Sequence, residues 1–181
     1  MKFLLLLLSA SVLYAGADMS KMYSYYQDDS FVKACDFGIK RLSKHKKDNK
    51  FISLYAFSCL NANRLDRLAL PITLLNQSEE DRKNAAFFSV ILMQKKLLIA
   101  SLKDGMTLSS LKLPTTDHLL SIVFDLYQEA EFKKIQKSYK LQDKNSPRKS
   151  YKLYYKSSGS TIKIVIEEYY DTIMKKRYII N

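Results

Sequence analysis

The sequence contains little of the material from which most catalytic and metal sites are built. Its 181 residues include two cysteines, two histidines and no tryptophan. Two cysteines exclude a disulfide-rich miniprotein, and two histidines leave little for metal binding or acid–base chemistry. Four glycines and three prolines supply few turns, which disfavours an all-β sandwich with many tight turns.

Motifs of enzymatic chemistry are also missing. The chain has no G-x-S-x-G, H-E-x-x-H, G-x-G-x-x-G or P-loop sequence. His45 lies in a lysine-rich turn, where we expect a solvated or helix-end role, and His118 lies in the first turn of a predicted helix. Glu167 and Glu168 are predicted to lie on opposite faces of a strand and to balance the charge of residues 175–177. We therefore predict no enzymatic activity, no cofactor and no metal; the alternative is an unrecognised hydrolase assembled from distant residues.

The first seventeen residues have the features of a cleaved export signal. Lys2 provides a short positive segment, residues 3–13 are almost entirely apolar, and Ala15 and Ala17 stand at the −3 and −1 positions of a signal peptidase site. The apolar stretch is too short to span a bilayer core of about 30 Å. We predict a signal peptide over residues 1–17 and a periplasmic or secreted protein; the alternative is an uncleaved N-terminal anchor.

A second apolar segment, residues 85–102, is interrupted in its middle by Gln94, Lys95 and Lys96. A lysine at the centre of a membrane span costs about 2.5–3.5 kcal/mol. We therefore expect this segment to form a buried helix rather than a membrane span.

The two cysteines lie at equal distances from a polar turn. Cys35 belongs to a helical pattern over residues 30–43 and Cys59 to another over residues 50–62, with the turn midway between them. Residues equidistant from the turn of an antiparallel helical hairpin lie side by side, and exported proteins meet an oxidising compartment. We predict a structural Cys35–Cys59 disulfide. The alternatives are two free buried thiols, or a reactive or zinc-binding pair, which lacks C-x-x-C spacing.

Helical periodicity continues through residues 18–130. Pro71 is expected to kink or restart one helix, Ser78 to cap the longest, and Gly105 to end it. The expected helices cover residues 18–27, 30–43, 50–62, 64–76, 78–104 and 116–130.

After residue 130 both the charge and the pattern change. Residues 18–130 carry 16 basic and 13 acidic side chains, whereas residues 131–181 carry 13 basic and 5 acidic ones. Apolar residues now alternate at a period of two on both sides of a turn at residues 157–160. We predict an α+β fold, in which an N-terminal helical hairpin array over 18–130 precedes a small antiparallel sheet of three or four strands over 131–181. The further strand candidates are residues 135–141 and 169–180; the alternative for residues 135–141 is that the preceding helix runs through them.

Residues 29–76 resemble tetratricopeptide or Sel1-like helical-hairpin repeats. The residues that carry the resemblance are Phe31, Ala34, Gly38 and Leu42 in one unit and Asn63, Leu65 and Leu68 in the next. The resemblance implies a stacked helical array whose concave face binds peptides or protein partners.

A basic and aromatic patch is the most prominent candidate for binding. Nine lysine and arginine residues fall between Lys133 and Lys156, interleaved with tyrosines. Lysines neutralise phosphates, and exposed rings offer stacking surfaces. The alternative is a solvated strand face in a lysine-rich protein. The candidate binding surface consists of Lys140, Arg148, Lys149, Tyr151, Lys152, Tyr154 and Lys156.

These observations favour a non-enzymatic exported adaptor that binds a protein partner in the cell envelope. The second hypothesis is a protein that binds envelope polyanions, either anionic lipid or polysaccharide, through the basic patch. The export signal argues against nucleic acid as a partner.

Overall fold

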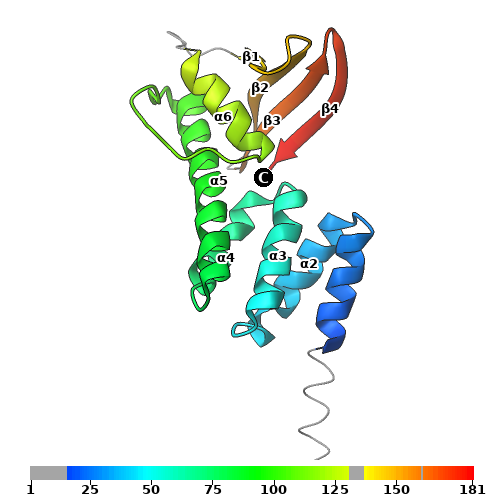
Figure 1. The fold of residues 1–181 in the computed structure, drawn as a ribbon. Helices are drawn as coiled ribbons and strands as arrows, with labels where there is room; N and C mark the ends of the chain where they lie inside the picture. Colours follow the sequence, from blue (N-terminus) through cyan, green and yellow to red (C-terminus); the bar gives the residue numbers. More distant parts are fainter. Residues whose placement is uncertain (1–15, 131–136, 160) are drawn as a thin grey trace, which may run out of the picture. The chain divides into compact units, whose positions relative to one another are not determined.

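The computed structural model describes residues 16–130, 137–159 and 161–181 of the chain (Figure 1). Within these residues, six helices precede a four-stranded antiparallel sheet, so the predicted α+β fold is confirmed. The contacts divide the chain into two compact units, Met1–Ala86 and Phe87–Asn181. The described residues do not include residues 1–15 of the predicted signal peptide. They also do not include residue 131, at which the sheet domain is predicted to begin.

The first unit is built around a helical hairpin. Asp48 caps the second helix of this hairpin, α3 (Asn49–Asn61). Its side chain accepts a hydrogen bond from the Phe51 amide at 3.1 Å. Lys40 and Arg41 in the last turn of the first helix stabilise its negative end. The elements in order are a helix over residues 16–27, α2 (Phe31–Arg41), the 3₁₀ turn η1 (Leu42–Lys44) and α3 (Asn49–Asn61).

Gly38 allows α2 to approach α3 closely. A Cβ atom at this position would lie 2.5 Å from Cδ2 of Tyr55 and 3.0 Å from Sδ of Met22. Both neighbours are completely buried, so neither ring nor thioether can move aside without disturbing the core. The close packing of the hairpin therefore requires glycine here.

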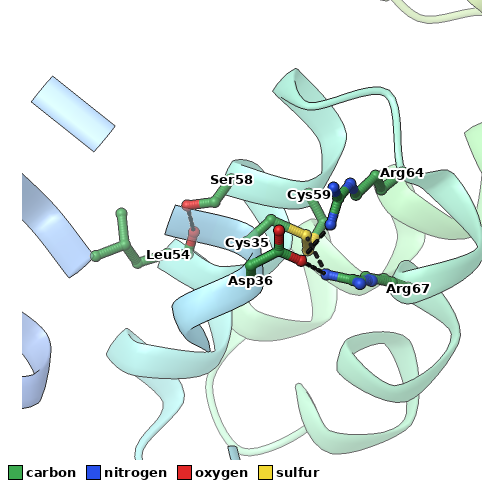
Figure 2. The surroundings of a disulfide bond; sticks show 7 residues. All are labelled: Cys35, Asp36, Leu54, Ser58, Cys59, Arg64 and Arg67. Carbon is green, nitrogen blue, oxygen red and sulfur yellow. Dashed lines mark hydrogen bonds and ion pairs between the residues drawn. A yellow bond between two sulfur atoms is a disulfide. The ribbon is translucent and has the colours of Figure 1, made fainter. Parts of the chain in front are cut away.

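Cys35 and Cys59 form a disulfide bond between α2 and α3, as predicted (Figure 2). Their Cα atoms are 4.8 Å apart, and both residues are completely buried. Disulfides persist mainly in oxidising compartments, so this bond is in keeping with a location outside the cytoplasm.

A charged cluster lies beside the disulfide (Figure 2). Asp36 accepts hydrogen bonds from Arg64 and from Arg67, the latter at 2.8 Å, and Nη1 of Arg67 lies 3.4 Å from Sγ of Cys35. Burial acts to raise the pKa of Asp36, but the hydrogen bonds from the two arginines outweigh it and hold this pKa below its usual range. The cluster ties the segment that follows α3 to α2.

The helix expected over residues 64–76 consists instead of two short pieces, η2 (Leu65–Leu68) and α4 (Ala69–Leu74). Pro71 lies in the first turn of α4, where its missing amide hydrogen removes no helical hydrogen bond. The chain therefore restarts its helix at this point rather than continuing through it.

Helix α5 (Glu79–Asp104) begins and ends at the predicted signals. The Ser78 amide donates to Asp81 at 2.8 Å, and the Asp81 amide donates to the Ser78 hydroxyl at 3.0 Å, which is a reciprocal capping box. Gly105 follows the helix with a φ of 76°, a conformation that favours glycine. The first eight residues of α5 belong to the first unit and the remainder to the second.

Among the described residues, α5 is the one helix that is long and apolar enough to cross a membrane, a property that the core helix of a soluble protein shares. Gln94 and Lys95 in its middle are buried within the protein. Gln94 donates a hydrogen bond to the carbonyl oxygen of Pro114 at 3.2 Å. Of the most apolar 18-residue window of α5, 39% is buried inside the protein, so the helix is partly buried.

The second unit contains the rest of α5, one further helix and the sheet. The strand order follows the chain, β1-β2-β3-β4, and each neighbouring pair is antiparallel. The elements are α6 (Leu119–Glu129), β1 (Tyr139–Gln142), β2 (Lys149–Ser158), β3 (Thr161–Tyr170) and β4 (Ile173–Ile180).

One turn of the sheet differs from the expectation. The pattern predicts a further β-rich run over residues 169–180, whereas β3 continues to Tyr170, and the chain reverses at Asp171 and Thr172 and pairs Tyr170 with Ile173. Asp171 has a φ of 55°, which aspartate tolerates better than most residues. The predicted first strand is present as β1, while its earlier part at Ile135 lies outside the described residues.

Candidate functional site

The sheet of the second unit has two chemically different faces. Tyr139, Leu153 and Ile166 stand in register on what we call the core face, and all three are buried. Helix α6 packs against this face, with the ring of Tyr127 5.0 Å from that of Tyr139. We call the opposite face the lysine face; it includes Lys140, Ser150, Lys152, Tyr154, Lys156, Lys163, Val165, Glu167, Tyr169, Arg177 and Ile179.

Four of the seven predicted surface residues share the lysine face. The three lysines among them are exposed, and the tyrosine is half-buried. These four are Lys140, Lys152, Tyr154 and Lys156.

The other three predicted residues lie elsewhere. Lys149 is on the core face, where its Nζ lies 2.9 Å from Oε1 of Glu168, and this hydrogen bond raises the pKa of Lys149. Tyr151 is 1% exposed on the same face, and Arg148 precedes β2 and pairs with Asp171. Alternate residues of a strand point to opposite faces, so the basic and aromatic run of β2 does not act as one surface.

Lysines stand directly opposite one another at two positions on the lysine face. Lys140 of β1 pairs with Lys152 of β2, and Lys156 of β2 pairs with Lys163 of β3. None of the four forms an ion pair with a carboxylate in the part of the chain that the structure describes. Like charges directly across a sheet are destabilising. The fold therefore carries two like-charged pairs on one surface, of which Lys156 and Lys163 have no acid in register, while Lys152 also stands opposite Glu167 of β3.

Glu167 is the one acid that the four strands place on the lysine face, and its oxygens are already occupied. Tyr154 and Tyr169 donate their hydroxyl hydrogens to it at 2.9 Å, and Arg177 binds it through Nε at 2.9 Å. Burial acts to raise the pKa of Glu167, but the hydrogen bonds from Tyr169, Tyr154 and Arg177 outweigh it and hold this pKa below its usual range. Glu167 therefore orders two tyrosines and an arginine and leaves the lysines uncompensated.

A hollow of about 490 Å³ opens at the Lys140 end of the lysine face. Two of its lining side chains are the opposed lysines, and several others carry hydroxyl groups. The lining residues are Ser138, Lys140, Ser150, Tyr151, Lys152, Tyr169, Asp171 and Thr172.

Residue composition alone did not identify Lys163, Tyr169 and Arg177 as members of this face. A usable signal was present, because counting outward from the turn at Gly159 brings Lys156 opposite Lys163. Arg177 depends on the turn at Asp171, which carries no glycine or proline to reveal it.

The two histidines do not belong to this site. His45 follows the last residue of η1, which agrees with the helix-end alternative. Its side chain is not solvated: it is 5% exposed, and its Nε2 lies 3.2 Å from Oδ2 of Asp18. Its ring also stacks on that of Phe51, with the ring centroids 4.0 Å apart. The side chain is therefore held inside the first unit.

His118 precedes α6 rather than lying within its first turn, because the helix begins at Leu119. Its Nδ1 accepts a hydrogen bond from the Leu120 amide at 3.2 Å. Burial lowers the pKa of His118 to about 4, so the ring is neutral at physiological pH. This histidine acts as a helix cap.

Over residues 16–130, 137–159 and 161–181, no group of three or more histidine, cysteine, aspartate or glutamate side chains is arranged to hold a metal ion. Comparison of the chain with protein-family models, curated proteins and solved structures gave no match. The resemblance to helical-hairpin repeats therefore stays a prediction.

Proposed function

We propose that this chain is a non-enzymatic exported protein that binds polyanions of the cell envelope through the lysine face. The observation that carries the proposal is that two pairs of lysines stand directly opposite one another, Lys140 with Lys152 and Lys156 with Lys163. A surface that only needed to be solvated would gain stability from an acid at one position of each pair. An anionic ligand supplies the missing negative charge from outside.

The order of the surrounding side chains supports the same function. Glu167 holds the rings of Tyr154 and Tyr169 by hydrogen bonds, which limits their freedom before a ligand arrives. Both rings stand among cations and add apolar contact area to an electrostatic surface. The arrangement suits ligands that present repeated negative charge, such as an acidic polysaccharide or a layer of anionic headgroups.

Export supports the choice of an envelope ligand. The disulfide between Cys35 and Cys59 is in keeping with an oxidising compartment. The predicted signal peptide over residues 1–17 provides the route, and we propose a periplasmic or secreted location on these two grounds.

The adaptor hypothesis stays a prediction and is less favoured by the sheet. The edge strand β4 carries Lys175, Lys176 and Arg177 in succession, and the pairing of β3 with β4 shifts register at Glu168 and Tyr169. Charged side chains and bulges are devices that protect a strand edge from pairing with another chain. This edge is therefore poorly suited to recruiting a partner strand.

Binding of the purified protein to dextran sulfate tests the proposal. The affinity should fall steeply between about 0.05 M and about 0.3 M salt, because the interaction is electrostatic. The double variant Lys156→Gln and Lys163→Gln should bind more weakly and with a shallower salt dependence. The matched control, Lys46→Gln and Lys47→Gln, removes the same charge from an exposed turn of the first unit. Equal weakening in both variants would show that net charge, rather than the lysine face, governs binding.

A further inference from the structure

We propose that the hollow at the Lys140 end of the lysine face binds a phosphate monoester, the terminal phosphate of a sugar or of a lipid headgroup. This inference rests on the proposed function, because the hollow is part of the lysine face. The proposal adds a discrete site for a phosphate group to a surface that otherwise attracts any polyanion.

The charges around the hollow favour a compact dianion. Directly opposed residues of an antiparallel pair have Cβ atoms about 4.5–5.5 Å apart, so the ammonium groups of Lys140 and Lys152 can reach one phosphate. Asp171 also lines the hollow, but Arg148 binds its carboxylate through Nε at 3.1 Å and Nη2 at 2.7 Å. Glu167, in register with Lys152, is saturated by its own donors. The two lysines are thus left with an excess of positive charge.

Hydroxyl groups complete the lining. Ser138, Ser150 and Thr172 face the hollow, and none of their hydroxyls has a hydrogen-bond partner in the described part of the chain. Ser150 is 5% exposed as a residue and lines the hollow. The terminal oxygens of a phosphate monoester accept hydrogen bonds from ammonium and hydroxyl donors alike.

The space available exceeds a bare phosphate. Small-molecule sites occupy about 300–1,000 Å³, and a hollow of about 490 Å³ has room for the sugar or glycerol group that carries the phosphate. The ring of Tyr169 lines the same hollow and offers an apolar surface to that group. The ligand class is therefore an organic phosphate with a free terminal phosphate.

Two probes separate the sources of such a phosphate. Glucose 1-phosphate is titrated into the purified protein and followed by amide NMR shifts, with methyl glucoside as the phosphate-free control. Vesicles that contain phosphatidic acid, a monoester, are compared in sedimentation with vesicles that contain phosphatidylglycerol, a diester. We expect saturable shifts at Ser138, Ser150 and Thr172 and preferential binding of the monoester vesicles. Saturation by glucose 1-phosphate alone identifies a soluble phosphate as the ligand, and saturation by the phosphatidic acid vesicles alone identifies a lipid-borne phosphate.

Variants connect the signal to the hollow. Lys140→Ala and Lys152→Ala should each weaken binding about tenfold, the loss expected for one charge-assisted hydrogen bond. Lys140→Arg should retain binding, and Lys156→Ala, on the same face but outside the hollow, should leave it unchanged. Because Lys140 is exposed, its replacement does not disturb the core.

The outcomes distinguish this site from the broader function. The phosphate site is overturned if neither phosphate probe binds, or if Lys140→Ala binds a probe with full affinity. This holds even when dextran sulfate still binds through the lysine face. Phosphate binding that depends on Lys140, combined with dextran sulfate binding that ignores Lys156 and Lys163, supports the site and overturns the polyanion function.

Discussion

Replacing Lys163 by glutamate should stabilise the protein and weaken its binding of polyanions at the same time. Lys163 stands opposite Lys156 across β2 and β3, and no other charged residue pairs with it in the register. The variant converts a repulsive cross-strand pair into an attractive one. A residue that lowers stability while it raises affinity is the expected mark of a binding surface.

The magnitude follows from the exposure and geometry of the pair. Cross-strand charge pairs are worth about 0.2–1 kcal/mol, and Lys156 is exposed while Lys163 is half-buried. Exchanging repulsion for attraction in this pair should give about 0.5–1 kcal/mol. For a chain of this length the midpoint of thermal unfolding should rise by about 1–4 °C. High salt should reduce the gain, because the Debye length falls from about 10 Å at 0.1 M to about 3 Å at 1 M.

Urea denaturation combined with amide hydrogen exchange of β2 and β3 provides the measurement, at low and at high salt. Lys46→Glu makes the same charge change in an exposed turn of the first unit and should alter neither the exchange of the sheet nor its salt dependence. The reasoning is refuted if Lys163→Glu leaves the sheet unchanged or less stable, or if dextran sulfate binds to it as tightly as to the unmodified protein.

Three further changes test other parts of the fold. His118 is held neutral with a pKa of about 4 against 6.5 when unfolded, so the stability that it contributes is complete above pH 6.5 and is lost as the pH falls toward 4. The loss is on the order of 3 kcal/mol. His118→Asn keeps a capping side chain that does not titrate, so the free energy of unfolding measured in urea should depend less on pH over this range. Cys35→Ser should cost about 3 kcal/mol of stability under oxidising conditions. In reductant, the variant and the unmodified protein should have the same midpoint of thermal unfolding. Gly38→Ala should cost about 1–3 kcal/mol in urea denaturation because of the clash with Tyr55.

Local signals in the sequence predict most of the helical architecture. The Cys35–Cys59 bond follows from helical spacing about a polar turn, and the ends of α5 follow from Ser78 and Gly105. The helix expected over 64–76 restarts near Pro71, as predicted, but it begins as the 3₁₀ turn η2 and ends already at Leu74. Features that depend on one or two neighbouring residues are therefore predictable, and features that depend on packing are less so.

The site is harder to predict because it depends on register. The density of lysine and tyrosine indicates the right strand, but the period of two sends Lys149 and Tyr151 to the core face. Lys163 and Arg177 join the lysine face only through turns distant from the patch. His45 illustrates the same limit, since its burial depends on Asp18, which lies far from it in the sequence.

The division of α5 between the two units has a practical consequence for dissecting this protein. A fragment that ends at residue 86 cuts the helix after its first turns, and one that begins at residue 87 discards the capping box at Ser78 and Asp81. Isolated helices shorter than about 12–15 residues are marginal in water, so the short stub loses its support. Melting of either unit likewise removes the tertiary contacts from part of the same helix. Fragments divided in a loop on either side of α5 therefore keep this helix whole, whereas a cut at the boundary between the units divides it.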